Sequence, residues 1–152
     1  MAESLYDIRK LKITKWTGLI LQIVLVALIF VPAAVMSDSG APVNSLQMGI
    51  LYLHHGGLLH IVGGGLYCAL LFAVPVAIWL VTLLRKPRMN YGICVALSAL
   101  EAVSSSCFYT MALHRMNSIF TMNFLRYVVV VLELVSMFVY IHAYFQAWQD
   151  SN

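Results

Sequence analysis

The chain alternates between long apolar runs and short polar segments. Four apolar runs, at about residues 16–36, 58–84, 91–113 and 119–144, are long enough to cross a membrane. A spanning helix needs roughly 20 largely apolar residues to cross roughly 30 Å of hydrocarbon. Within lipid, helices satisfy their own backbone hydrogen bonds. The pattern therefore predicts an all-α fold, a four-helix transmembrane bundle that forms a single domain over residues 1–152.

The second run is preceded by further apolar sequence. No Asp, Glu, Lys or Arg occurs between Leu46 and Leu84. One straight helix of that length would measure roughly 58 Å, too long for one crossing. We therefore predict an additional interfacial or re-entrant segment over Leu46–His55, broken at Gly56 and Gly57. Residues 1–15 are charged and mixed, and we expect one or two helical turns at the interface there.

Composition and charge narrow the class of protein. Hydrophobic residues make up 62% of the chain and charged residues only 10%, whereas soluble domains have about 25% charged residues. The net charge of +3 does not indicate nucleic-acid binding, because the basic residues lie mostly in two segments. These segments hold Arg9, Lys10, Lys12 and Lys15, and then Arg85, Lys86 and Arg88. The positive-inside rule then predicts cytoplasmic N- and C-termini, in a bacterial inner membrane or an organelle membrane.

Two carboxylates lie near the middle of the third and fourth runs. An acidic residue at mid-span costs roughly 3 kcal/mol, so it should face protein or water, find partners or take up a proton. Helical spacing places each acid on a polar stripe. These stripes are Cys94, Ser98, Glu101, Ser104, Ser105 and Phe108, and Arg126, Glu133, Ser136 and Tyr140. We expect the two stripes to face each other or a third partner.

The two acids allow two interpretations. They can be packing groups between helices, where polar contacts contribute about 0.6 kcal/mol on average. They can also form a proton, cation or cationic-substrate site from Glu101, Glu133, Ser98 and Ser105, with Arg126 as a counter-charge to Glu133.

Four of the five histidines lie toward the ends of the runs opposite the termini: His54, His55, His60 and His114. Glycines flank His60 at helical spacing, so a flat porphyrin could approach the backbone there. This arrangement suggests haem b with His60 and His114 as axial ligands. Copper held by imidazole and thioether groups, with His54 and His55, is the alternative. The competing interpretation is that these glycines pack helices together.

Three functions follow from these observations. The short loops leave no room for a substrate-binding apparatus, so we expect a non-catalytic subunit of a larger membrane complex or a homo-oligomer. Its partners would be the lipid bilayer and other membrane subunits or copies of itself, without nucleic acid. The second hypothesis is a proton- or cation-coupled small transporter or channel that uses Glu101 and Glu133. The third is a haem- or copper-binding redox subunit that uses His60 and His114.

Overall fold

The computed structural model describes the backbone of residues 2–84 and 87–149, and the side chains of residues 9–84 and 89–149. The predicted basic turn at Arg85 and Lys86 and the side chain of Arg88 lie outside the described residues. The elements follow in the order α1 (Ala2–Ile29), β1 (Pro32–Met36), β2 (Pro42–Asn44), α2 (Ser45–His54), α3 (Leu58–Leu83), α4 (Pro87–Arg115), β3 (Phe120–Met122) and α5 (Leu125–Gln149).

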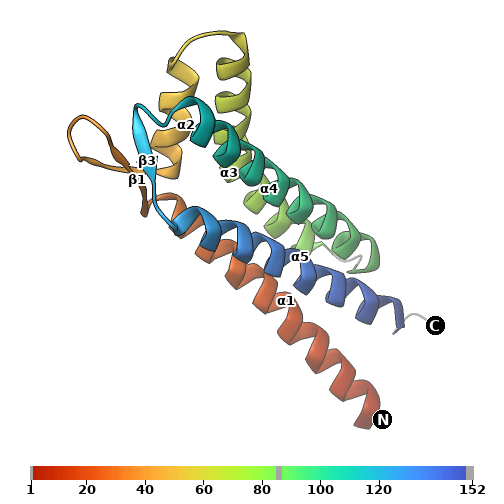
Figure 1. The fold of residues 1–152 in the computed structure, drawn as a ribbon. Coiled ribbons are helices and arrows are strands. Elements are labelled where there is room, and N and C mark those ends of the chain that lie inside the picture. The colour runs from red at the N-terminus through yellow and green to blue at the C-terminus, as the bar shows by residue number, and fades with distance from the viewer. Residues whose placement is uncertain (1, 85–86, 150–152) are drawn as a thin grey trace.

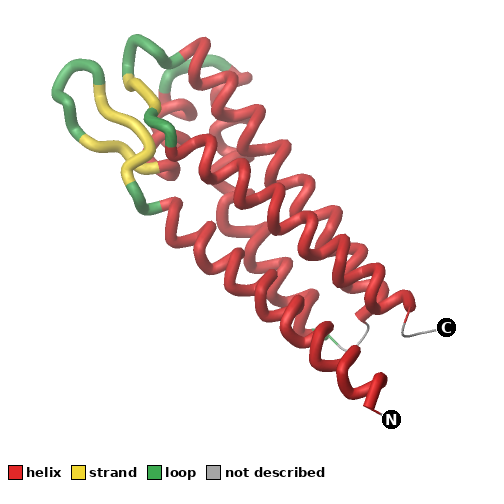
Figure 2. Tube along the Cα trace, turned by 60° about the horizontal axis from the view of Figure 1, so that its bottom comes forward, coloured by secondary structure: helices red, strands yellow, loops and turns green. Residues whose placement is uncertain are grey.

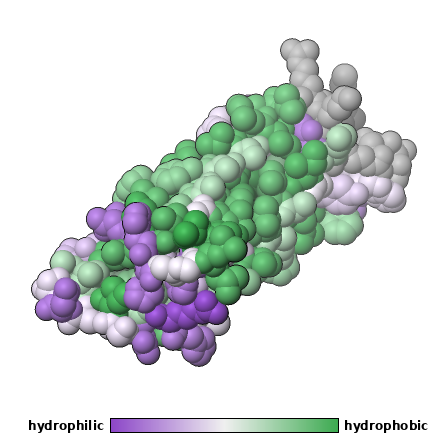
Figure 3. All heavy atoms as spheres, turned by 90° about the horizontal axis from the view of Figure 1, so that it is seen from above, coloured by the Kyte–Doolittle hydropathy of each residue, from purple (hydrophilic) through white to green (hydrophobic). Residues whose placement is uncertain are grey.

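Four helices, α1, α3, α4 and α5, are long and apolar enough to span a membrane. They expose large apolar side chains, including Ile20 at 55%, Leu66 at 57% and Phe138 at 62%. Acyl chains accommodate such surfaces, whereas a soluble monomer rarely exposes extended apolar patches. Apolar side chains cover the middle of the face shown in Figure 3, and hydrophilic ones gather most strongly at one end. The predicted all-α, multi-pass membrane architecture is confirmed.

The four long helices lie side by side (Figure 1). Helix α5 packs against α1 and α4, and α3 packs against α4. Both termini lie at one end of the bundle, which we call the terminal end. The strands and α2 lie at the opposite end, which we call the sheet end (Figure 2). This arrangement turns the polar stripes of α4 and α5 toward the interior.

A small antiparallel sheet, which the sequence analysis did not predict, has the strand order β2-β1-β3. Ala34 of β1 pairs with Val43 of β2 and with Met122 of β3. The predicted first span, 16–36, is therefore wrong at its end, because α1 stops at Ile29 and β1 begins at Pro32. Proline lacks a backbone N–H and disfavours a continuing helix, so the chain turns into a strand there.

The fourth span, expected over 119–144 with Leu125 as the alternative start, begins at Leu125, because Phe120–Met122 is a strand. Asn123 makes this junction. Its side chain accepts a hydrogen bond from the Leu125 N–H at 2.9 Å and donates one to the Pro32 carbonyl at 3.0 Å. At the other end of the chain, α1 runs without interruption from Ala2, which corrects the expected short interfacial helix.

Helices α2 and α3 form a tight hairpin. The additional segment predicted over Leu46–His55 forms helix α2, and the predicted break at Gly56 and Gly57 is confirmed, with φ values of +104° and +83°. A Cβ on Gly64 of α3 would lie 2.8 Å from the backbone N of Leu53 and 2.9 Å from the carbonyl O of Gly49. The backbones of the two helices therefore touch at Gly64.

We expect Gly64→Ala to destabilise the protein by about 1–2 kcal/mol, because the added methyl group meets backbone that cannot move aside. Gly65→Ala is the matched control, since its Cβ would meet only the side chain of Leu53 at 3.5 Å. Both changes bring the same gain in helix propensity. Unfolding of the two variants in mixed detergent micelles measures the difference, and equal stabilities would contradict the close contact.

Candidate functional site

A layer of buried polar side chains crosses the interior of the bundle between α1, α4 and α5. Glu101 is 7% exposed and Glu133 is 2% exposed, so both acids are shielded from lipid. The expectation that the stripes of α4 and α5 face each other is confirmed. We call these six side chains the carboxyl layer: Gln22, Ser98, Glu101, Ser105, Glu133 and Ser136.

Gln22 of α1 joins the other two helices. Its Nε2 donates to Glu101 Oε2 at 3.2 Å and to Ser136 Oγ at 2.9 Å. Gln22 is fully buried, and it is the only strongly hydrogen-bonding side chain deep in its helix. A lone polar side chain deep in an apolar helix is a sign of a buried partner. The sequence does not show, however, that this partner of Gln22 is Glu101.

Ser105 forms a hydrogen bond with the second acid: its Oγ donates to Glu133 Oε1 at 2.7 Å. The other carboxyl oxygen, Glu133 Oε2, is buried and has no hydrogen-bond partner among the described residues. Gln22 Oε1 and Ser98 Oγ are likewise buried without a hydrogen-bond partner among the described residues. Buried polar atoms normally have a partner, so the layer retains unused capacity to bind a proton, a water molecule or an ion.

Two small cavities lie beside the acids. One has a volume of about 20 Å³ and the other about 10 Å³, and Glu101 and Glu133 line both. A water molecule needs roughly 10–15 Å³ of such space and several polar partners. The larger cavity therefore has room for about one water molecule in contact with both carboxyl groups.

Hydroxyl groups continue the layer toward the sheet end. The Tyr67 hydroxyl donates to the Tyr109 hydroxyl at 3.5 Å, and the Ser45 hydroxyl lies 3.5 Å from that of Tyr109. Ser45 and Tyr109 also line the larger cavity. Hydroxyl groups both donate and accept hydrogen bonds, so these three extend the polar interior from the acids toward the sheet end. Sequence reasoning did not identify these three hydroxyls, because they lie far apart along the chain and meet only in the fold.

Arg126 does not contact the acids. It lies two turns from Glu133, roughly 10 Å along the helix axis. Its Nη2 donates to the Tyr127 hydroxyl at 2.8 Å, and its Cζ lies 4.7 Å from the centre of the Tyr127 ring. The structure therefore pairs Arg126 with its neighbour instead of directly with Glu133.

Three of the histidines, His54, His55 and His60, lie in the α2–α3 hairpin. The His60 ring centre is 4.7 Å from that of Tyr52 and 5.7 Å from that of His55. His54 Nδ1 lies 2.8 Å from the carbonyl O of Ile50, and His114 is exposed in the last turn of α4. In the described part of the chain, no three or more His, Cys, Asp or Glu side chains group where they could hold a metal ion.

The glycines beside His60 pack against protein. Helix α2 covers Gly64, and a Cβ on Gly63 would lie 3.5 Å from Tyr52 and 3.8 Å from Met111. Gly63 and Gly64 therefore serve helix packing, and the structure offers no open glycine face at these two positions. Haem or copper binding stays a prediction without support from this surface.

Comparisons of the chain with protein families, with curated proteins and with solved structures found no match. The geometry of the carboxyl layer is therefore the basis for a functional proposal.

Proposed function

We propose that this protein is a small membrane transporter or channel that binds and exchanges a proton or cation at Glu101 and Glu133. One observation carries the proposal: both carboxyl groups lie in the interior of the bundle and line the same two small cavities. Ionisable residues held within membrane spans commonly mark ion pathways and proton relays.

A purely structural role explains this layer less well. Each buried polar atom without a partner costs about 1–3 kcal/mol. Glu133 Oε2, Gln22 Oε1 and Ser98 Oγ have no partner among the described residues. A layer selected only for packing would gain stability from replacing these groups. A site that binds and releases an ion needs polar atoms that are free to contact the ion.

The charge pattern orients the proposed pathway. Arg9, Lys10, Lys12 and Lys15 all lie in the first half of α1, at the terminal end. The positive-inside rule then favours a cytoplasmic terminal end and places the sheet on the opposite side of the membrane. On this side, the hydroxyl groups of Ser45, Tyr67 and Tyr109 lead toward the carboxyl layer.

The test is flux through liposomes that contain the full chain. We expect Glu101→Gln and Glu133→Gln each to reduce flux to the level of protein-free liposomes. An amide carries no negative charge to bind a cation and does not take up and release a proton. A pH-sensitive dye measures proton flux, and sodium- and potassium-sensitive dyes measure cation flux. Asp38→Asn, in an exposed loop at the sheet end, is the control and should leave flux unchanged.

Wild-type flux of all three ions through both glutamine variants would contradict the proposal. Circular dichroism and size-exclusion profiles of each variant establish that it is folded, so that a loss of flux reports the missing carboxylate.

A second candidate function, a subunit of a larger assembly, is favoured by the beginning of α3. This helix has 26 residues and measures about 39 Å, which exceeds roughly 30 Å of hydrocarbon. Leu58 and Leu59 at its first turn are 76% and 71% exposed. A partner subunit or second copy would cover them. The mass of the particle extracted in mild detergent tests this, and a stable monomer would count against it.

A further inference from the structure

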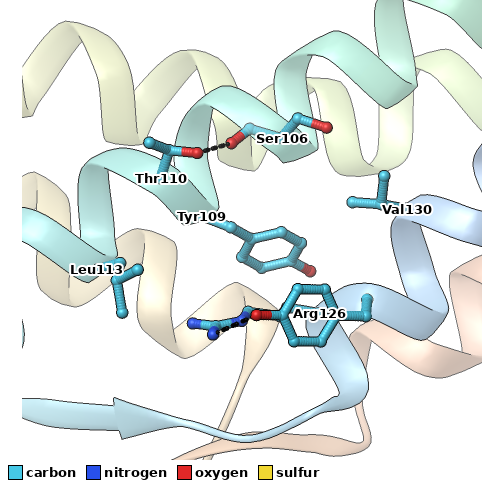
Figure 4. Close-up of a pocket in the computed structure, with 7 residues that line it drawn as sticks. Ser106, Tyr109, Thr110, Leu113, Arg126 and Val130 are labelled. Carbon is cyan, nitrogen blue, oxygen red and sulfur yellow. Dashed lines mark hydrogen bonds between the residues drawn. The ribbon is translucent and has the colours of Figure 1, made fainter.

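An open groove lies between α4 and α5 near the sheet end (Figure 4). Its volume is about 310 Å³. Ser106, Thr110 and Leu113 of α4 and Arg126, Tyr127 and Val130 of α5 line it. The groove is separate from the carboxyl layer, and neither the proposed function nor its test depends on it.

The groove carries its cationic side chain, Arg126, at the end nearest the sheet. Helix α4 runs toward the sheet end and α5 runs away from it, so Leu113 and Arg126 lie at the sheet end of the groove. Ser106 and Val130 lie deeper, and the distance from residue 106 to residue 113 along α4 is roughly 10 Å. The groove therefore runs along the helices, with its cationic group near the membrane surface and Ser106, Thr110 and Val130 below.

Arg126 contacts the side chain of its neighbour Tyr127. Its guanidinium group donates to the Tyr127 hydroxyl at 2.8 Å and lies over the Tyr127 ring at 4.7 Å. A guanidinium group has five N–H donors, so most of them remain for an anion in the groove. Figure 4 shows the side chain lying along the groove, below Tyr109. A planar donor set of this kind matches phosphate oxygens.

Tyr109 forms the inner wall of the groove. It is 5% exposed, and its hydroxyl contacts Tyr67 and Ser45 on the interior side. It also lines the larger cavity beside the acids. A molecule in the groove would therefore contact the ring of Tyr109 without reaching Glu101 or Glu133.

We propose that this groove binds an anionic phospholipid from the leaflet on the sheet side. The phosphate receives hydrogen bonds from Arg126, and one acyl chain lies along Tyr109 and Val130. The order of charge and apolar surface in the groove matches that of a lipid in this leaflet. Basic pockets between membrane helices bind anionic headgroups by the same electrostatic principle.

Native mass spectrometry of the full chain, with phosphatidylglycerol or phosphatidylcholine added to the detergent, tests the proposal. We expect phosphatidylglycerol to bind about tenfold more tightly, because Arg126 prefers its net negative charge. Arg126→Gln should remove this preference. Arg115→Gln is the matched control: it removes the same charge from an exposed residue at the end of α4 and should retain the preference.

Val130→Trp tests the apolar part of the groove without changing Arg126, and it should weaken phosphatidylglycerol binding. Three results would overturn the proposal: equal binding of the two lipids, an unchanged preference in Arg126→Gln, or equal losses in Arg126→Gln and Arg115→Gln. Persistence of wild-type binding in Val130→Trp would overturn the assigned position of the acyl chain. Because these measurements involve no ion flux, they succeed or fail independently of the proposed transport function.

Discussion

Replacing Phe108 with alanine will lower the free energy of unfolding by about 3–5 kcal/mol. The ring is 1% exposed and lies at the centre of an aromatic cluster near the sheet end. It stacks on Tyr67 with a centroid distance of 3.7 Å and an interplanar angle of 5°, and it meets Tyr52 edge-on at 5.5 Å. Helices α2, α3 and α4 each contribute one of these rings, so alanine leaves a cavity where the three helices meet.

Unfolding by titration with sodium dodecyl sulfate, followed by circular dichroism, measures the loss. Phe138→Ala is the matched control, because it removes the same ring from a lipid-facing site that is 62% exposed. Such a surface change usually alters stability by only about 0.5 kcal/mol. If the two variants lost equal stability, Phe108 would not be part of a packed core.

Replacing Tyr140 with alanine will also cost about 3–5 kcal/mol. Tyr140 is fully buried in the cluster at the terminal end. A Cβ on Gly18 would lie 2.7 Å from Tyr140 Cζ and 2.8 Å from its hydroxyl oxygen, so the ring occupies the space that glycine leaves on α1. The alanine variant loses this contact between α1 and α5. The same detergent titration measures the change.

Tyr140→Phe separates the ring from its hydroxyl group. The hydroxyl oxygen is buried without a hydrogen-bond partner among the described residues. Removing it should therefore leave stability unchanged or raise it by up to about 1 kcal/mol, since no bond is lost and an unsatisfied group disappears. A loss in Tyr140→Phe as large as that in Tyr140→Ala would show that the hydroxyl binds a partner, such as an internal water molecule.

Two hydrophobic clusters lie on either side of the carboxyl layer. The cluster around Phe108 packs on its sheet side, and the cluster around Tyr140 packs on its terminal side. The acids are therefore shielded from water along the bundle as well as from lipid across it. In this closed arrangement, a proton or cation can reach the acids only by transfer along hydroxyl groups or after a movement of the side chains in these clusters.

The sequence was sufficient to predict the four spans and the inward faces of two of them. Hydrocarbon requires long apolar helices, and the cost of a charge in lipid turns Glu101 and Glu133 inward. Both arguments use only residues near one another along the chain. The helical repeat then places Ser98, Ser105 and Ser136 on the same faces as the acids, as the structure confirms.

Only the tertiary structure decided which groups meet these faces. The pairing of Gln22 with Glu101 joins positions 79 residues apart, and the β1–β3 pairing joins two strands that are separated by α2, α3 and α4. Such contacts depend on which helices become neighbours. The hydrophobic pattern of the sequence fits every possible arrangement of four spans about equally well, so it does not select one. The apolar runs and the two acids therefore determined the number of spans and the inward faces of α4 and α5, while packing between distant segments determined the partners of the acids.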